Sequence, residues 1–150
     1  MRAVIQRVSK ASVTIDNKVF SKIDKGLLIL LGVGTDDNEE DIQWLAKKIA
    51  NMRLFPNEKG NLDLSVVDLN AEILVISQFT LFASTKKGNR PSFLNSAKPE
   101  VAEPLYEKFV SELQKLIDKP LKTGVFGADM KVDLLNDGPV TICMDTKNKE

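Results

Sequence analysis

The segment Ser77-Gln78-Phe79-Thr80-Leu81 places three hydrogen-bonding side chains, Ser77, Gln78 and Thr80, at the end of an apolar run. Functional sites form at such strand ends, but the same side chains can also satisfy nearby backbone groups. A hydroxyl nucleophile at Ser77 or Thr80 would need a general base beside it. The chain contains no histidine, so the usual base of serine and cysteine hydrolases is missing. We therefore interpret these residues as positioning groups and not as nucleophiles.

A Gly-Pro step at Gly138-Pro139 separates two apolar stretches near the end of the chain. Proline fixes φ, removes a backbone N–H and is the residue for which a cis peptide bond is accessible, and glycine tolerates unusual backbone angles. Such a step leaves carbonyl oxygens fixed and unpaired. They are either the spare acceptors of a turn, which is the commoner case, or a prepared recognition surface, and the residues alone leave both interpretations open.

Three further features could contact a ligand or do chemistry. The basic stretch at residues 86–93 suits either a solvated loop or a phosphate contact. In the stretch at residues 123–130, Phe126 and Met130 could pack against a flat ring or simply fill the core. Cys143 has no imidazole partner, which favours a structural thiol.

Composition limits the classes of function that remain. A chain of 150 residues with 43% hydrophobic content predicts one domain over residues 1–150, with a polar tail at residues 146–150 that we expect to fray. Its 21 basic and 21 acidic side chains give no net charge that would attract phosphate groups to the molecule as a whole, so any RNA contact must be local. The lack of histidine also argues against imidazole-dependent zinc sites, and we expect neither a metal nor a cofactor.

The chain's apolar segments and its cysteine content predict where the protein works. The first residues lack the apolar core of a signal peptide, and no run reaches membrane-spanning length. A single cysteine excludes an internal disulfide and fits a reducing compartment. We expect a soluble cytoplasmic protein with no membrane partner.

Apolar runs and turn residues predict short strands at residues 3–8, 12–15, 19–23, 27–33, 62–66, 72–77, 130–135 and 140–145. The run at residues 27–33 does not alternate, so we expect it to be buried on both faces at the centre of a sheet. The turn between the second and third strands is expected at Asp16-Asn17. Gly138-Pro139 would connect or interrupt the last two strands.

Two helices are predicted from apolar stripes. The first follows an N-cap arrangement of Asp37 and Glu40, and its stripe consists of Ile42, Leu45, Ile49 and Met52. The second is expected over residues 101–117, with a stripe of Val101, Leu105, Phe109, Leu113 and Ile117. Pro99 suits its first turn, whereas Pro104 would kink the helix or move its start toward Glu103. Strands thus outnumber helices, which predicts an α/β fold: a compact β/β/α sandwich or partly closed β-barrel with two main helices outside.

Taken together, these segments closely resemble the D-aminoacyl-tRNA deacylases, formerly called D-tyrosyl-tRNA deacylases. The most specific matches are Ser77-Gln78-Phe79-Thr80-Leu81 and Asn136-Asp137-Gly138-Pro139-Val140-Thr141. The stretches Met1-Arg2-Ala3-Val4-Ile5-Gln6-Arg7-Val8, Arg90-Pro91-Ser92-Phe93 and Thr123-Gly124-Val125-Phe126-Gly127-Ala128-Asp129-Met130 support them. Because the motifs occur in order over nearly the whole chain, a chance match is improbable.

The resemblance implies a homodimer that hydrolyses the ester between a D-amino acid, or glycine, and the terminal adenosine of tRNA. This is a proofreading activity that rejects L-aminoacyl-tRNA. It implies that Gly138-Pro139 is a cis peptide that reaches into the partner subunit's pocket. There its carbonyl oxygens would capture the substrate's amino group and leave no room for an L side chain. Arg7 would hold this loop in orientation, although the residue alone could equally be an exposed strand arginine.

The resemblance also implies roles at the strand end. Backbone N–H groups around Phe79 and Thr80, with Ser77 and Gln78 beside them, would bind the ester and its developing oxyanion. Substrate-binding positions carried over from the family are Leu81, Ala97, Phe126 and Met130, the last two bordering the adenosine. The tRNA's own 2′-hydroxyl would help to activate water, which agrees with the lack of histidine.

Two other functions remain open from the sequence. A non-catalytic module could use the same pocket to bind a tRNA end or a D-amino acid without hydrolysing anything. A conventional hydrolase could instead use Thr80 as its nucleophile. The 86–93 stretch supports only a weak expectation of RNA contact.

Overall fold

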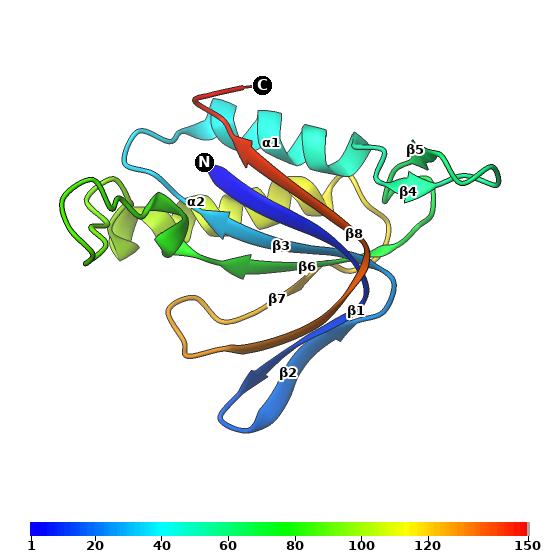
Figure 1. Cartoon of the computed structure of the whole chain (residues 1–150), viewed down its shortest axis with the longest axis horizontal. Coiled ribbons are helices and arrows are strands. Elements are labelled where there is room, and N and C mark those ends of the chain that lie inside the picture. The colour runs from blue at the N-terminus through cyan, green and yellow to red at the C-terminus, as the bar shows by residue number, and fades with distance from the viewer. Residues whose placement is uncertain (150) are drawn as a thin grey trace.

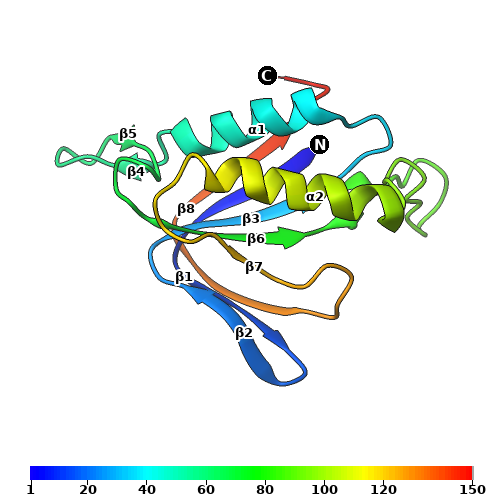
Figure 2. The same ribbon diagram turned by 180° about the vertical axis from the view of Figure 1, so that it is seen from behind.

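The structure is a computed structural model that describes residues 1–149, and it consists of a strongly bent β-sheet with two helices on one side (Figures 1 and 2). The long strand β1 (Arg2–Ile15) organises the sheet. Its first half pairs with β3 (Gly26–Gly32), its second half pairs with β2 (Lys18–Ile23), and β8 (Lys131–Asp145) runs antiparallel along both halves. The two strands predicted at residues 3–8 and 12–15 are therefore one, as are those predicted at 130–135 and 140–145.

Parallel pairing extends the sheet beyond β3. The strand order is β2-β1-β3-β6-β7, in which β6 (Glu72–Ser77) runs parallel to β3 and β7 (Lys122–Thr123) runs parallel to β6. The central position of β3 and its burial on both faces confirm the prediction. Asp16 and Asn17 have positive φ values of 49° and 60° in the tight turn between β1 and β2, as expected for a two-residue hairpin. A separate small hairpin is formed by β4 (Phe55–Pro56) and β5 (Leu62–Leu64), so the strand predicted at 62–66 is shorter than expected.

The helices α1 (Glu39–Asn51) and α2 (Pro99–Gln114) cover one face of the sheet and enclose the larger core. On the other face the bent strands enclose a second cluster of buried residues: Val8, Ala11, Val13, Ile23, Leu28, Leu74 and Ile76. The prediction of a partly closed barrel with two helices outside is confirmed.

The start of α1 differs from the prediction. Asn38 caps the helix by accepting from the Glu40 N–H at 2.9 Å, and Asp41 completes the capping box by accepting from the Asn38 N–H at 2.9 Å. Asp37 is not the cap, because its carboxylate binds the Met1 amino group and accepts from the Gly34 N–H at 2.6 Å.

The second helix also differs at both ends. It begins at Pro99 and ends at Gln114, and Pro104 lies inside it on the exposed face. A missing hydrogen bond costs little there, because water can bind the freed Glu100 carbonyl. Val101 is 51% exposed, so the predicted stripe is wrong at its first residue. The buried stripe is Ala102, Tyr106, Phe109 and Leu113.

The C-terminal segment is held in place at its beginning. Thr146 is buried, its N–H donates to the Met1 carbonyl at 2.9 Å, and Lys147 forms an ion pair with Asp41 at 2.6 Å. These two residues therefore contact the rest of the chain, fraying of the tail stays a prediction, and Glu150 lies outside the described residues. In the described chain, neither helix is long and apolar enough to cross a bilayer.

Candidate active site

The segment that carries three polar side chains leaves the sheet at the end of β6. The Gln78 N–H donates to the Leu31 carbonyl at 2.7 Å, which extends the pairing by one residue. The chain then turns into a single 3₁₀ turn, η1 (Phe79–Phe82). Within residues 1–149, the N–H groups of Phe79 and Thr80 have no acceptor, since the first hydrogen bond of this turn is donated by Leu81. Two adjacent backbone donors are thus left free beside Ser77.

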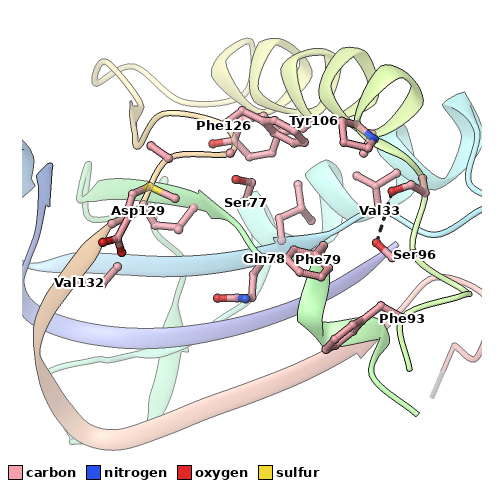
Figure 3. Close-up of a pocket in the computed structure, with 18 residues that line it drawn as sticks. Val33, Ser77, Gln78, Phe79, Phe93, Ser96, Tyr106, Phe126, Asp129 and Val132 are labelled. Atoms are coloured by element: carbon pink, nitrogen blue, oxygen red, sulfur yellow. Dashed lines mark hydrogen bonds between the residues drawn. The ribbon is translucent and has the colours of Figure 1, made fainter. Parts of the chain in front are cut away.

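A cavity of about 560 Å³ opens next to this turn, between the ends of β3 and β6, the start of α2 and the loop before β8. Figure 3 shows Phe126 and Tyr106 beneath α2 on one side of it, Phe79 and Phe93 on the other, and Ser77 between them. The rings of Phe79 and Phe93 meet edge to face, with their centroids 5.1 Å apart. The lining is mainly apolar, and its few polar groups come from Ser77, Gln78, Ser96, Tyr106 and Asp129.

Most of the residues predicted for the site line this cavity. Ser77, Gln78 and Phe79 come from the strand end, Ala97 from the segment before α2, and Phe126 and Met130 from the loop before β8. These residues are separated by up to 53 positions in the sequence. The fold brings together every one of these six.

Thr80 is not among the residues that line the cavity, although it follows the lining residue Phe79, and its contacts bear on the nucleophile question. The Gln78 side-chain amide donates to the Thr80 Oγ1 atom. Among the described residues, no carboxylate or amine contacts this hydroxyl, so no general base is poised to deprotonate it.

Leu81 does not line the same cavity. Its carbonyl accepts from Arg2 Nη1 at 3.0 Å, and its side chain lines a second hollow of about 660 Å³ together with Trp44 and Cys143. This second hollow is the larger one, but it contains none of the other predicted site residues. The end of β6 is therefore the better candidate site.

Gly138 and Pro139 also lie away from the cavity of their own chain, where both are exposed. The peptide bond between them is cis. The pairing of β1 with β8 explains their projection. Gln6 faces Thr141 and Val8 faces Asn136, so the single residue Arg7 stands opposite residues 137–140. The extra residues form a bulge that pushes the Gly-Pro step out of the sheet.

Arg7 lies beneath this bulge and is only 7% exposed. Its Nε donates to the Asp137 carbonyl at 2.8 Å and lies 3.4 Å from the Asp137 carboxylate, while Nη1 donates to the Leu54 carbonyl at 2.7 Å. Arg7 is therefore not an exposed strand arginine. It ties the Gly-Pro bulge to the segment that follows α1.

Tyr106 is a lining residue that the sequence analysis did not single out. Its hydroxyl is buried and donates to the Val75 carbonyl at 2.9 Å, and burial raises the pKa of this group well above its usual range. The group therefore stays neutral and closes one end of the cavity. The spacing of Ala102, Tyr106 and Phe109 on one helical face was the signal that could have found it.

Comparisons with known proteins agree with the motifs. The D-Tyr-tRNA(Tyr) deacylase family matches residues 4–145. D-aminoacyl-tRNA deacylases of Flavobacterium psychrophilum and Bacteroides thetaiotaomicron are each 61% identical to this chain, over all of both chains. A solved structure of the c-Myc DNA unwinding element binding protein has a TM-score of 0.92 at 41% identity, covering 97% of this chain and 98% of that one.

A more distant structure supports the fold alone. A probable eukaryotic D-amino acid tRNA deacylase has a TM-score of 0.81 at 15% identity, covering 95% of this chain and 97% of that one. The family match spans almost the whole chain, and the relatives match it end to end. The chain belongs to the D-Tyr-tRNA(Tyr) deacylase family.

Proposed function

We propose that this protein hydrolyses the ester bond between a D-amino acid and the terminal adenosine of tRNA, and that the cavity at the end of β6 is its active site. The observation that carries the proposal is the pair of free N–H groups on Phe79, which lines this cavity, and on Thr80, which follows it. Its relatives are named D-aminoacyl-tRNA deacylase, and they align with this chain over its full length. The predicted location is the cytoplasm.

The two N–H groups suit the developing charge of ester hydrolysis. As water adds to the ester carbonyl, its oxygen becomes negative, and fixed donors stabilise that charge without reorganising. In acyl-transfer enzymes, removal of one such donor typically raises the activation free energy by about 3–4 kcal/mol. Ser77 and Gln78 stand beside these donors and would orient the ester.

The apolar part of the cavity suits the adenine base. Phe126 and Met130 offer a flat ring and a polarisable sulfur, which pack well against an aromatic base. Ala97 also lines the cavity, and its small side chain leaves room for the base. The ester would then lie toward Phe79, at the end that carries the free donors.

No side chain among the described residues is arranged as a nucleophile with its base, so the substrate itself would assist. The tRNA's 2′-hydroxyl lies next to the 3′-ester and can help to activate water. Water adds to the carbonyl carbon, the bond to the 3′-oxygen breaks, and the proton lost by water passes to that leaving oxygen. The products are free tRNA and the amino acid.

Gly138-Pro139 would supply chiral selection to a second subunit. The step is exposed, lies outside its own chain's cavity and is braced by Arg7, as expected of a rigid element that serves a neighbour. Fixed carbonyls attract the substrate's ammonium group and exclude an L side chain by contact. Glycine has no side chain and would pass the same filter.

The decisive measurement is release of amino acid from tRNA charged with D-tyrosine, L-tyrosine or glycine. We expect fast release of D-tyrosine and of glycine, and little release of L-tyrosine. Equal rates for D- and L-tyrosine would sink the proposal. Tight binding of the charged tRNA with an unchanged ester lifetime would favour the non-catalytic binding module instead.

Sharing of the site between subunits can be tested by mixing two inactive variants. Gly138→Ala damages the Gly-Pro step, and Ala97→Leu fills the cavity. A heterodimer of the two has one intact cavity facing one intact Gly-Pro step, so mixing and refolding should restore activity. If no activity returns although heterodimers form, the step does not act across subunits.

A further inference from the structure

The segment between the proposed oxyanion donors and α2 is strongly basic, although the chain as a whole is neutral. Residues 79–98 contain four cations and no acidic side chain. These cations are Lys86, Lys87, Arg90 and Lys98, and all four are exposed. Such a local excess is unusual in a chain with 21 basic and 21 acidic side chains.

The four cations are also unpaired. Within residues 1–149, no carboxylate forms an ion pair with any of them. Other exposed lysines, such as Lys108 and Lys131, do find an acidic neighbour. The positive charge of this segment is therefore available to a ligand.

The segment is fixed at the mouth of the cavity. Ser84 and Ser92 exchange two backbone hydrogen bonds of 2.8 and 2.9 Å, which close residues 85–91 into a loop. Further along, the Ala97 N–H donates to the Val33 carbonyl at 3.0 Å, which anchors the segment to the end of β3. Figure 1 shows the loop at the end of the molecule where β3 and β6 finish.

Phe93 connects the loop to the cavity. It lines the cavity and contacts Phe79, and Arg90 precedes it by three residues. The two Cα atoms can therefore be at most about 11 Å apart. The loop therefore lies within reach of the phosphates that precede a terminal base bound in the cavity.

We propose that Lys86, Lys87 and Arg90 bind the phosphates of the single-stranded 3′ end of tRNA, next to the terminal adenosine. This rests on the proposed function, because it takes the cavity to hold that adenosine. The loop would supply affinity for RNA of any sequence, while the cavity would hold the terminal adenosine and its ester. Three exposed cations close together in the sequence, none paired with a carboxylate in residues 1–149, are complementary in charge to a polyanion.

The proposal predicts a measurable salt dependence. Three phosphates neutralised on a single strand correspond to a slope of about −2 for the logarithm of affinity against the logarithm of salt concentration. Between about 50 and about 200 mM salt, this slope amounts to a loss of roughly 20-fold. A substrate without phosphates should show no such dependence.

The test compares D-tyrosyl-tRNA with D-tyrosyl adenosine, which carries the same ester but no phosphate. In the triple variant Lys86→Ala, Lys87→Ala, Arg90→Ala, we expect kcat/KM for the tRNA to fall by roughly 30-fold at low salt. The salt slope should become shallower by about 2, and turnover of the adenosine ester should stay within about twofold. A charge-matched control, Lys59→Ala, Lys115→Ala, Lys119→Ala, changes the opposite end of the molecule and should behave like the unmodified protein.

Equal losses on both substrates would overturn the proposal, since the three cations would then act on the fold or the chemistry and not on the RNA. An unchanged salt slope would overturn it as well. The proposed function fails separately, if the unmodified protein releases no D-tyrosine from either substrate. In that case the Kd for uncharged tRNA still tests the loop: the triple variant should bind more weakly than the control, and equal Kd values would contradict the loop's role.

Discussion

Arg7 Nε lies 2.8 Å from the carbonyl oxygen of Asp137, the residue immediately before Gly138. The same guanidinium donates through Nη1 to the Leu54 carbonyl, so one buried side chain links the Gly-Pro bulge to the end of the α1 segment. The planar guanidinium carries several donors and can satisfy both carbonyl acceptors at once, which a lysine ammonium cannot do. The orientation of Gly138-Pro139 therefore depends on a residue that lies on a different strand.

Arg7→Lys should keep the charge but lose one of the two carbonyl contacts. An unpaired buried acceptor costs about 1–3 kcal/mol, and we expect a loss of stability in that range in urea unfolding. The rate of D-tyrosyl-tRNA deacylation should fall about 100-fold, and the ratio of D to L release should fall too. A purely structural role would leave that ratio unchanged. Arg53→Lys, at an exposed pair with Asp63, is the matched control.

Gly138→Ala should disturb the bulge directly. Gly138 has φ of 135°, and an added Cβ would lie 2.9 Å from Val140 Cγ2 and 3.0 Å from Arg7 Nη2. The strained backbone costs about 1–3 kcal/mol, and relief of the contacts would displace the step. We expect deacylation to fall by at least about 100-fold while the far-ultraviolet circular dichroism stays unchanged.

Gly60→Ala is the control for this substitution. Gly60 also has a positive φ, of 82°, but an added Cβ there would meet nothing within 4 Å. It should lose about 1 kcal/mol of stability through its backbone alone and keep full activity. Comparable activity losses in the two variants would show that backbone strain, and not the position of the Gly-Pro step, matters.

The strands that the sequence predicts best are those that can be recognised from the apolar pattern of their own residues, without knowledge of their pairing partners. β3 was predicted because an apolar run of seven residues without alternation suits a strand that is buried on both faces, and β6 was predicted with the bounds that it has. The continuity of β8 could not be predicted in this way. Whether Gly138-Pro139 ends a strand or bulges from it depends on its register with Arg7, which lies 131 positions earlier.

The helix ends show the same limit. Asp37 and Asn38 are both good caps, and the choice between them depends on the Met1 amino group and the Gly34 N–H, which draw Asp37 away. In α2 the buried stripe begins at the small residue Ala102, whereas the sequence drew attention to the larger Val101 beside it. Five cavity residues were predicted from motifs of a resembling family and Ala97 as a single position carried over from it, but Tyr106 belongs to no such motif.

The ion pair of Asp41 with Lys147 should make the stability of the fold depend on pH in the acidic range. Burial acts to raise the pKa of the Asp41 carboxyl, but hydrogen bonds from Lys147, Thr146 and the Asn38 N–H outweigh it and hold the pKa at about 2, below its ordinary value of 3.8. The folded state holds the Asp41 proton less tightly than the unfolded state does. The contribution of the ionised Asp41 to the free energy of unfolding is therefore complete above about pH 4. It is lost as the pH falls toward 2, and it amounts to roughly 2 kcal/mol.

Asp41→Asn should therefore lose roughly 2 kcal/mol in urea unfolding at pH 7, and the gap to the unmodified protein should close at pH 2. Hydrogen bonds from Ser65 also lower the pKa of Asp68, so some acid sensitivity will remain in the variant. Lys147→Met removes the partner and should reproduce part of the effect. A constant gap between pH 7 and pH 2 would mean that the carboxyl does not titrate in this way.

Thr80→Val separates the proposed mechanism from a covalent one. The substitution removes the hydroxyl that accepts from the Gln78 amide but keeps both the side-chain shape and the backbone N–H that we assign to the oxyanion. If Thr80 only positions its neighbour, kcat/KM for D-tyrosyl-tRNA should fall by no more than about tenfold. Loss of a true nucleophile would cost at least about 10⁴-fold. Ser77→Ala removes the other hydroxyl at this strand end, so the pair of variants shows whether either oxygen is indispensable.

Rapid mixing supplies the second readout on the mechanism. A burst of free tRNA ahead of free D-tyrosine would reveal an acyl-enzyme and contradict direct attack by water, whereas simultaneous release of the two products is the expected result.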